Sequence, residues 1–280
     1  MIKNIGIIGG TGNMGSCFRN AFENLGLNIQ VSDINSKDKE DHIIENSDWI
    51  ILTVPINETL KVFKNIKNKI KKNQIFSDFT SVKSILANDI NNCNFEFISC
   101  HPLFGPLNNL NGQNIVTIPI VSKEKHPLII EVFEKIGLKI TELKSFKEHD
   151  EYMSLIQGMT HFSHVCFTTA MKKLNPDLDK IMEICSPIYQ SNISFSSRIT
   201  GGDENLYTNI IMDNPLNKKV IELYLETAKE LFEKIKIDDH ESFKKNFVEN
   251  RKYLKNHLNK MINQSDFLVN KMAEFKNKPK

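Results

Sequence analysis

The chain has 280 residues, of which 40% are hydrophobic and 25% are charged, so it has enough apolar material for one large core or two modest ones. The formal net charge is +2 and the charges are spread along the sequence, so neither a nucleic-acid partner nor a membrane surface is expected. Five scattered cysteines without metal-ligand spacing predict reduced thiols, no metal site and a cytoplasmic location. No signal peptide is expected, and no apolar run reaches the roughly 20 residues of a membrane span.

The first half of the sequence alternates short apolar runs with amphipathic stretches. Several of the runs are apolar throughout, which is typical of strands that are covered on both faces. The alternation of strands and helices predicts an α/β domain with a doubly wound parallel sheet over residues 1–146. Strands are predicted at residues 5–10, 28–33, 48–55, 74–80, 95–101 and 114–120, with a first helix at 13–25.

Residues 147–280 are predicted to form a second, all-helical domain, because strand signals are absent there. Its last helix is predicted to be long, with Phe247, Leu254, Met261 and Leu268 recurring every seven residues. A stripe of this kind needs a partner helix, from the same chain or from a second subunit. Helix breaks are predicted near residues 175–176, 186–187, 201–202 and 214–215, at Asn-Pro, Ser-Pro and Gly-Gly pairs.

A glycine pattern, G-x-G-x-x-G, directly follows the first predicted strand and opens the first helix. Gly10 would allow the tight turn, Gly12 would let a pyrophosphate approach the backbone, and Gly15 would let helix and strand pack closely. The N–H groups near Asn13 and Met14 would then point at phosphate oxygens. The pattern predicts a dinucleotide site.

Asp33 ends the second predicted strand. A carboxylate at this place accepts hydrogen bonds from a ribose 2′-OH and repels a 2′-phosphate, so the cofactor is predicted to be NAD rather than NADP. Thr11 in the loop, with Val54 and Pro55 at the end of strand 48–55, completes the predicted cofactor-binding set. The alternative is a glycine-rich turn with an Asp on the surface.

The segment "SCHPLFGP" places His101 where a buried strand ends and a stiff loop begins. In a parallel sheet the carboxyl ends of the strands meet at one edge, so His101 is expected beside Ser81 and Lys83, which follow strand 74–80. A neutral imidazole with an ordinary pKa of about 6.5 can take a proton from a substrate hydroxyl while hydride leaves the same carbon. The alternative is that His101 only caps its strand.

Seven segments in order, over nearly the whole chain, resemble the prephenate dehydrogenase family: "GGTGNMG", "TVPINET", "TSVKS", "HPLFGP", "EHDEYMSLIQGMTHF", "SPIYQ" and "SRITGGDENLYTNIIM". The most specific are "HPLFGP" and the "SPIY…SR" pair. The resemblance implies NAD-dependent oxidative decarboxylation of prephenate to 4-hydroxyphenylpyruvate, in tyrosine biosynthesis. It also implies a Rossmann domain over 1–146, a helical substrate-binding and dimerisation domain over 147–280, and a homodimer. The chorismate mutase segment of bifunctional relatives has no counterpart, so a monofunctional enzyme is expected.

The resemblance implies that His101 hydrogen-bonds the ring C4 hydroxyl of the substrate and that Ser81 lies beside it, near the nicotinamide. These two are the expected catalytic residues. His149 and Asp150 match an "HD" pair that is expected to order the start of a helix and the wall of the site, rather than to take part in the chemistry.

For substrate binding, the resemblance implies that Arg198 grips the ring carboxylate, that His161 is a further site histidine and that Lys83 contacts substrate or cofactor. A planar guanidinium suits a substrate with two carboxylates. Gln190 stands where the bifunctional relative has arginine after "SPIY". This departure leaves the partner of the second carboxylate, and inhibition by tyrosine, open.

Other functions stay possible on the sequence alone. The substrate could be arogenate or 4-amino-4-deoxyprephenate. A β-hydroxyacid dehydrogenase has a similar two-domain build but relies on a lysine of the helical domain. A non-catalytic NAD-binding dimer would keep the glycines and Asp33, with no need of His101, Ser81 and Arg198 together.

Overall fold

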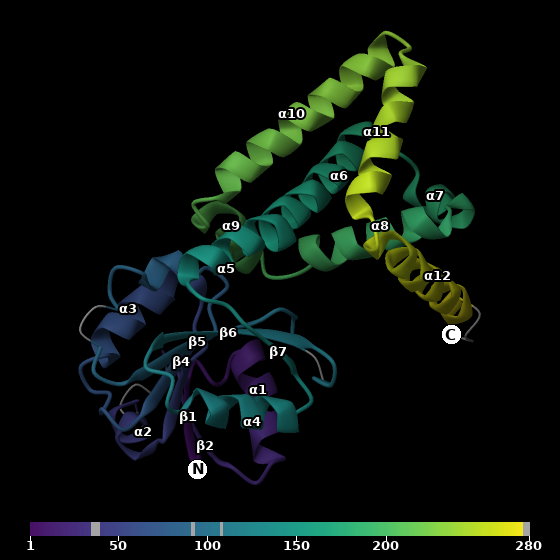
Figure 1. Cartoon of the computed structure of the whole chain (residues 1–280). Coiled ribbons are helices and arrows are strands. Elements are labelled where there is room, and N and C mark those ends of the chain that lie inside the picture. Colours follow the sequence, from purple (N-terminus) through teal and green to yellow (C-terminus); the bar gives the residue numbers. More distant parts are fainter. Residues whose placement is uncertain (35–39, 91–92, 107–108, 277–280) are drawn as a thin grey trace. The chain divides into compact units, whose positions relative to one another are not determined.

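The computed structural model describes residues 1–34, 40–90, 93–106 and 109–276, and the chain divides into two compact units, Met1–Met153 and Ser154–Lys280 (Figure 1). The expected domain boundary, after residue 146, falls at the start of α5 (Phe146–Met153), whereas the two units divide at the end of this helix. This helix belongs to the first unit, because its His149 and Asp150 bond to residues of that unit.

The first unit is built on a seven-stranded sheet with the order β2-β1-β3-β4-β5-β6-β7. The pairs from β2 to β5 are parallel, β5 and β6 are antiparallel, and β6 and β7 are parallel. The predicted α/β fold with a doubly wound sheet is confirmed, but the sheet is mostly rather than wholly parallel, because β6 is reversed, and the extra strand β7 was not predicted. The strands are β1 (Asn4–Ile8), β2 (Asn28–Ser32), β3 (Trp49–Leu52), β4 (Ile75–Asp78), β5 (Glu96–Pro102), β6 (Asn114–Val121) and β7 (Lys139–Glu142).

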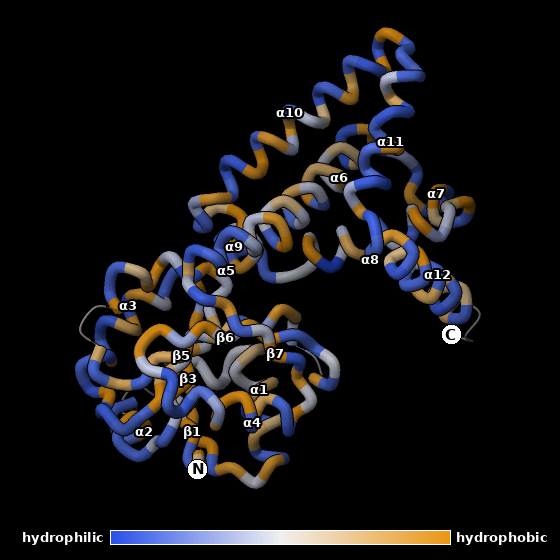
Figure 2. The backbone as a smooth tube through the Cα atoms, viewed as in Figure 1, coloured by the Kyte–Doolittle hydropathy of each residue, from blue (hydrophilic) through white to orange (hydrophobic). Residues whose placement is uncertain are grey.

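Helices cover the sheet on both faces, and successive strand residues alternate between two apolar cores. In β3, Trp49 and Ile51 belong to the core under α1 and α4, whereas Ile50 and Leu52 belong to the core under α2 and α3. Figure 2 shows orange, apolar segments in the middle of this unit, near the labels of β3 and β5. Burial on both faces explains why these runs are apolar throughout. The helices are α1 (Asn13–Glu23), α2 (Glu40–Asn46), α3 (Ile56–Ile66) and α4 (His126–Lys135), with a short 3₁₀ turn η2 (Ser84–Leu86).

The second unit contains helices and no strand within residues 154–276. All four predicted breaks are confirmed. Asn175 takes a left-handed conformation with φ 48° after α6, and Pro187 begins α8 behind a Ser186 cap. The elements are the π-helical turn η3 (Ser154–Met159), α6 (Thr160–Leu174), α7 (Leu178–Ile184), α8 (Pro187–Thr200), α9 (Glu204–Asp213), α10 (Asn217–Lys236), α11 (His240–Leu254) and α12 (His257–Lys276).

The prediction of one long last helix is wrong. Helix α11 ends at Leu254, and Lys255 has a positive φ of 43° before α12 begins. The apolar stripe is therefore divided, with Phe247 and Leu254 on α11 and Met261 and Leu268 on α12. Neither glycine nor proline marks this break in the sequence, and Asn256 alone, without a neighbouring proline, is a weak turn signal.

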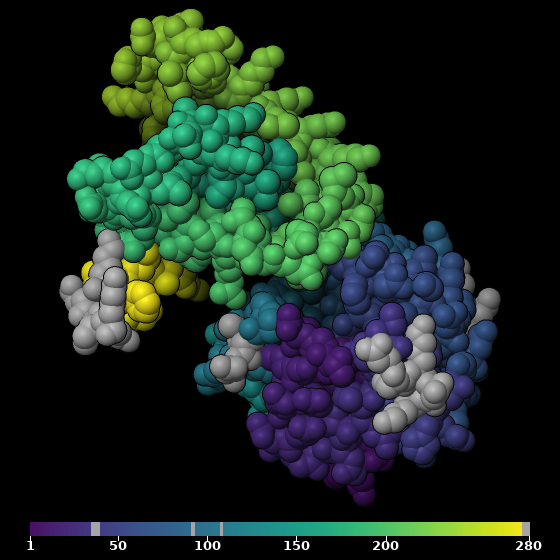
Figure 3. Space-filling view, turned by 180° about the vertical axis from the view of Figure 1, so that it is seen from behind, coloured from purple at the N-terminus to yellow at the C-terminus, as the bar shows by residue number. Residues whose placement is uncertain are grey.

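The helical unit leaves much apolar surface uncovered. Helices α6, α7 and α11 contain no buried residue, and Phe247, Tyr253 and Phe267 are 62%, 83% and 61% exposed. In the space-filling view the atoms of α10 form an outer edge of this unit (Figure 3). Exposed apolar area of this extent marks an interaction surface. In the part of the chain that the structure describes, no helix combines the length and the apolar character needed to cross a membrane.

Candidate active site

The glycine loop after β1 is shaped by contacts that exclude side chains. Gly9 has the positive φ of 84°, and a Cβ there would lie 2.9 Å from the Thr53 carbonyl carbon. The tight turn thus depends on Gly9, rather than on Gly10 as the motif predicted. Gly10 is needed for packing, because its Cβ would lie 2.6 Å from Cγ1 of Val31.

Gly12 and Gly15 serve different purposes at the start of α1. A Cβ on Gly15 would lie 2.5 Å from the Gly9 oxygen and 2.7 Å from the Gly10 Cα, so loop and helix touch there. A Cβ on Gly12 would meet only the Gly9 oxygen, at 3.3 Å. Gly12 is the cap residue of α1, which begins with Asn13 and Met14, and no side chain among the described residues caps it. The N–H groups of this helix end are therefore available to an anion.

These contacts predict opposite outcomes for two small substitutions. Gly15→Ala should lower the free energy of unfolding by about 1–3 kcal/mol, because the added methyl overlaps backbone that cannot move independently. Gly12→Ala should keep the Tm and weaken NAD binding, because its methyl would occupy the approach to the helix end. Thermal unfolding and coenzyme titration of both variants test this. Equal Tm losses would contradict the distinction.

Asp33, at the end of β2, is held against the glycine loop. Its Oδ2 accepts hydrogen bonds from the Thr11 hydroxyl and, at 3.3 Å, from the Thr11 N–H, and its Oδ1 accepts from the Ile34 N–H at 2.8 Å. The Thr11 hydroxyl is the main reason that the pKa of Asp33 lies below its ordinary value. An ionised carboxylate thus lies beside the phosphate loop, where a ribose would need it.

The end of β3 completes this edge of the sheet. Thr53 donates its N–H to the Ile8 oxygen, and the Val54 N lies 3.0 Å from the Cβ position of Gly9. Pro55 caps α3 and is exposed. A glycine cradle that any side chain would fill, an uncapped helix start and a fixed carboxylate together fit a dinucleotide.

A fully buried ion pair lies at the carboxyl end of β4. The Lys83 ammonium is 2.6 Å from Asp78 Oδ1 and donates to the Cys100 carbonyl at 2.7 Å, while Asp78 Oδ2 accepts from the Ser99 hydroxyl at 2.5 Å. Both charged side chains are 0% exposed. Lys83 was expected to contact substrate or cofactor, but its ammonium points into the protein and holds the residue that precedes His101.

His101 lies at the end of β5 and is 2% exposed. Its Nδ1 is 2.8 Å from Nε2 of His149, whose Nδ1 is 2.8 Å from Oδ1 of Asp150. The Asp150 oxygens also accept from the N–H groups of Lys83, at 3.0 Å, and Ser84, at 2.9 Å. A role limited to capping a strand does not explain these contacts.

Burial sets the charge states of His101, His149 and Asp150. It lowers the pKa of His101 well below 6.5, and the Lys83 charge acts in the same direction, as would a protonated His149. Burial also lowers the pKa of His149, although the hydrogen bond that His149 donates to Asp150 acts to raise it. For Asp150 burial acts to raise the pKa, but hydrogen bonds from His149 and from the backbone of Lys83 and Ser84 hold it below its ordinary value. Neutral histidines beside an ionised carboxylate result.

Ser81 lies in the loop between β4 and η2, at the same carboxyl edge of the sheet, and is half-buried. Its neighbour Thr80 is 5% exposed, and the Thr80 hydroxyl has no hydrogen-bond partner within the described residues. A buried hydroxyl of this kind is normally satisfied, so a ligand or water is its natural partner.

The remaining predicted residues belong to the second unit. His161 on α6 packs edge-on against Tyr207 of α9, with ring centroids 5.1 Å apart, and burial lowers its pKa to about 4. A Cβ on Gly202 would lie 2.5 Å from the Tyr207 ring and 3.3 Å from the Arg198 carbonyl, so Tyr207 lies between the His161 ring and the end of α8. Arg198 is exposed in the last turn of that helix, and Gln190 is half-buried nearer its start.

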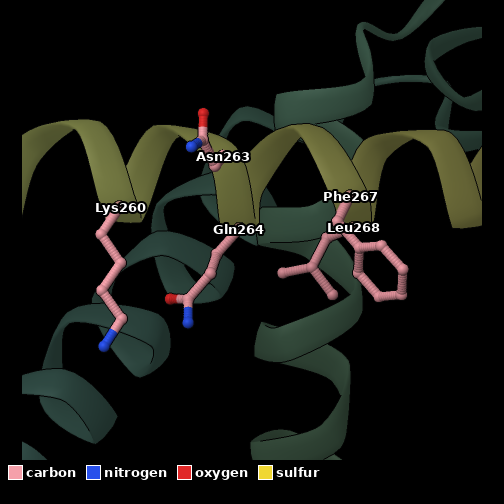
Figure 4. Close-up of a pocket in the computed structure, with 5 residues that line it drawn as sticks. All are labelled: Lys260, Asn263, Gln264, Phe267 and Leu268. Atoms are coloured by element: carbon pink, nitrogen blue, oxygen red, sulfur yellow. The ribbon is translucent and has the colours of Figure 1, made fainter.

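A hollow on α12 has a different character (Figure 4). All of its lining residues come from one helix, and Lys260 is the one ionisable side chain among them: Lys260, Asn263, Gln264, Phe267 and Leu268. We therefore assign it to the exposed apolar surface of the helical unit and not to the active site.

Four features of the candidate site were not predicted from the sequence: the turn at Gly9, the buried Asp78, the contact of Tyr207 with His161, and the hydrogen bond between His149 and His101. One signal was present for Asp78, since a carboxylate inside the apolar run "IFSDF" needs a buried partner, and Lys83 follows five residues later. Nothing in the sequence pairs His149 with His101, because 48 residues separate them.

Taken together, a mostly parallel sheet covered on both faces and a glycine loop before a helix define a nucleotide-binding protein of the Rossmann type with a separate helical unit. Comparison with family models is more specific. The prephenate dehydrogenase nucleotide-binding domain matches residues 19–141, and the prephenate dehydrogenase dimerization domain matches residues 145–250. The chain belongs to the prephenate dehydrogenase family. The first match begins after the glycine loop, so the loop is assigned on its own geometry.

Individual relatives have names that agree with this family. A probable arogenate/prephenate dehydrogenase of Methanocaldococcus jannaschii is 31% identical over 270 residues, which cover 89% of this chain and 60% of that protein. The T-protein of Haemophilus influenzae is 28% identical over 277 residues, with 98% and 73% covered. The chain thus spans less than two thirds of the first relative's length and about three quarters of the second's.

Among solved structures, prephenate dehydrogenase from A. aeolicus, in complex with hydroxyphenyl propionate and NAD+, has a TM-score of 0.68 at 18% identity, covering 90% of this chain and 96% of that one. Arogenate dehydrogenase from Synechocystis also has a TM-score of 0.68, at 19% identity, covering 91% and 99%. At this level of identity, the likeness supports the fold.

Proposed function

We propose that the chain catalyses the NAD-dependent oxidative decarboxylation of prephenate to 4-hydroxyphenylpyruvate. The observation that carries the proposal is the buried His101 at the carboxyl end of β5, hydrogen-bonded to His149, on the same sheet edge as the glycine loop and Asp33. An acid–base group beside a dinucleotide loop is the arrangement needed to remove a proton and a hydride from one carbinol.

The cofactor site consists of the glycine loop, the start of α1 and Asp33. NAD+ held there would supply the hydride acceptor. The ionised Asp33 carboxylate, fixed by Thr11, would bind the ribose hydroxyls and repel a 2′-phosphate, which favours NAD+ over NADP+.

His101 is the proton acceptor in this reaction. The neutral imidazole draws the proton of the C4 hydroxyl while that carbon loses hydride. Carbon dioxide then leaves C1, and its bonding electrons complete the aromatic ring. The proton returns to the same oxygen, which becomes the phenol of the product. Because no net proton is released, His101 only has to hold the proton during hydride loss.

The second unit supplies the substrate grip in this proposal. The exposed Arg198 guanidinium would bind the ring carboxylate of prephenate through paired hydrogen bonds. His161, neutral because its pKa is about 4, would contribute a hydrogen bond rather than a charge. Gln190 would face the side-chain end of the substrate. The uncovered apolar surface of α11 and α12 supports a homodimer formed through this unit.

The buried position of His101 predicts the pH dependence. Burial lowers its pKa well below 6.5, and a general base works only when it is unprotonated. Activity should therefore be lost as the pH falls through this lowered pKa, and the acid limb of kcat/KM should lie below pH 6.5. A profile of kcat/KM for prephenate at saturating NAD+ measures it. An acid limb at or above 6.5 would contradict the burial argument.

Two close substrates are the alternatives. Arogenate carries an amine in place of the side-chain keto group, and the name of the Methanocaldococcus relative includes both substrates. A relative from Streptomyces pristinaespiralis is named 4-amino-4-deoxyprephenate dehydrogenase. Comparing kcat/KM for the three compounds at saturating NAD+ tests the proposal, which expects prephenate to be the best substrate. A higher value for either analogue would reassign the substrate.

A further inference from the structure

His101, His149 and Asp150 form a row that is closed to solvent. The three residues are 2%, 0% and 1% exposed, and both links between them are 2.8 Å long. His101 ends a strand, whereas His149 and Asp150 lie on α5, so the row joins two elements that are distant in sequence.

The hydrogen positions in the row follow from the acceptor at its end. Asp150 accepts two backbone N–H groups, from Lys83 and Ser84, and an ionised carboxylate can only accept. Nδ1 of His149 must therefore carry the proton that faces Asp150. In a neutral imidazole the other nitrogen, Nε2, is then an acceptor, so the proton between the two histidines belongs to Nδ1 of His101.

The groups around His149 favour this neutral form. Burial lowers its pKa and the Lys83 charge acts in the same direction, whereas Asp150 and Asp78 oppose them. The Asp78 charge is itself compensated by the Lys83 ammonium at 2.6 Å. Doubly protonated His149 would donate to His101 and reverse the assignment, so its charge state decides the geometry.

We propose that His149 is a positioning residue that, anchored by Asp150, accepts the Nδ1–H of His101 and so makes Nε2 of His101 the nitrogen that receives the hydroxyl proton of the substrate. This inference rests on the proposed function for its catalytic meaning, while the tautomer can be observed without substrate. A third group that fixes the tautomer of a catalytic base is a recurrent solution in enzymes.

Lys83 closes the arrangement into a ring of contacts. Its N–H holds Asp150 at one end of the row, and its ammonium holds the Cys100 carbonyl next to His101 at the other end. Rotation of the His101 ring would break its bond to His149. The burial of Lys83 thus has a consequence for the base although its charge does not face the substrate.

The experiment combines a spectroscopic and a kinetic measurement on the full chain. Nitrogen NMR of histidine-labelled protein with NAD+ bound should find His101 protonated at Nδ1 and unprotonated at Nε2. His149→Phe keeps the bulk of the side chain but loses the acceptor. It should lower kcat about tenfold or more, which is part of the rate gain that a general base provides. His149→Gln can accept from His101 and donate to Asp150, so it should restore most of that loss.

Several outcomes would overturn the proposal: an Nε2-protonated His101 in the parent protein, equal kcat for the Phe and Gln variants, or an unaltered kcat in His149→Phe. If His149→Phe does not fold, the NMR assignment and the Gln variant still decide. The matched control is His126→Gln, a buried histidine of the same unit that contacts Thr117 and Glu142, which should keep kcat. Failure of prephenate as a substrate would leave the NMR result intact and so count against the proposed function alone.

Discussion

Replacing His101 with asparagine is expected to lower kcat by about 10²-fold or more, the usual contribution of a general base. Asparagine can still accept from the C4 hydroxyl, but it cannot hold the proton while hydride leaves. Coenzyme affinity should be retained, because the glycine loop and Asp33 lie on other strands of the sheet. Steady-state kinetics with prephenate, together with NAD+ titration, measure both effects.

The matched control is His42→Asn. His42 is exposed on α2, and within the described residues its hydrogen bonds join it to Asn46 of the same helix. This variant should keep kcat within a factor of about two, the range of neutral surface changes. An unchanged kcat in His101→Asn would remove His101 from the chemistry. A loss of NAD+ binding in that variant would indicate a structural role instead.

Lys83→Met is expected to lower the free energy of unfolding of the first unit by about 3–5 kcal/mol. The substitution keeps the length of the side chain but leaves the Asp78 carboxylate buried without its cation, which is the costly way to break a buried pair. It also removes the donor to the Cys100 carbonyl. Denaturant unfolding followed by the fluorescence of Trp49, the sole tryptophan and a residue of this unit's core, measures the loss.

Two variants test the cause of this loss. Lys61→Met removes a lysine from an exposed pair with Glu58, at 71% and 45% exposure, and should change stability by less than about 1 kcal/mol. Adding Asp78→Asn to Lys83→Met should recover part of the stability, because no uncompensated charge is left. A Lys83→Met loss as small as that of Lys61→Met would mean that the buried pair stabilises little.

The sequence was sufficient for the fold class because β1, β3, β4 and β5 in the middle of the sheet are buried on both faces, and such strands are largely apolar. An apolar run does not show whether its strand is parallel or antiparallel to its neighbour. Residues 114–120 were therefore predicted as a strand, but the reversed direction of β6 was not predicted. Helix breaks were found where a proline or a pair of glycines stood, and missed at Lys255, whose positive φ has no signal in its residue type.

The sequence predicted those parts of the candidate site that lie within short motifs. The glycines and Asp33 lie within one βαβ segment, and His101 follows a strand of the same sheet. The burial of Lys83 and the contact from His149 to His101 depend on how β4, β5 and α5 pack, and no short motif encodes that packing. The convergence of His101 with Arg198 of the second unit stays a prediction of the family resemblance.

The most direct test of the account is product analysis with prephenate and each coenzyme. We predict that prephenate and NAD+ yield NADH, carbon dioxide and 4-hydroxyphenylpyruvate in equal amounts, and that NADP+ supports a much slower reaction. Binding of NAD+ without turnover of prephenate, arogenate or 4-amino-4-deoxyprephenate would contradict it and would indicate a non-catalytic NAD-binding protein.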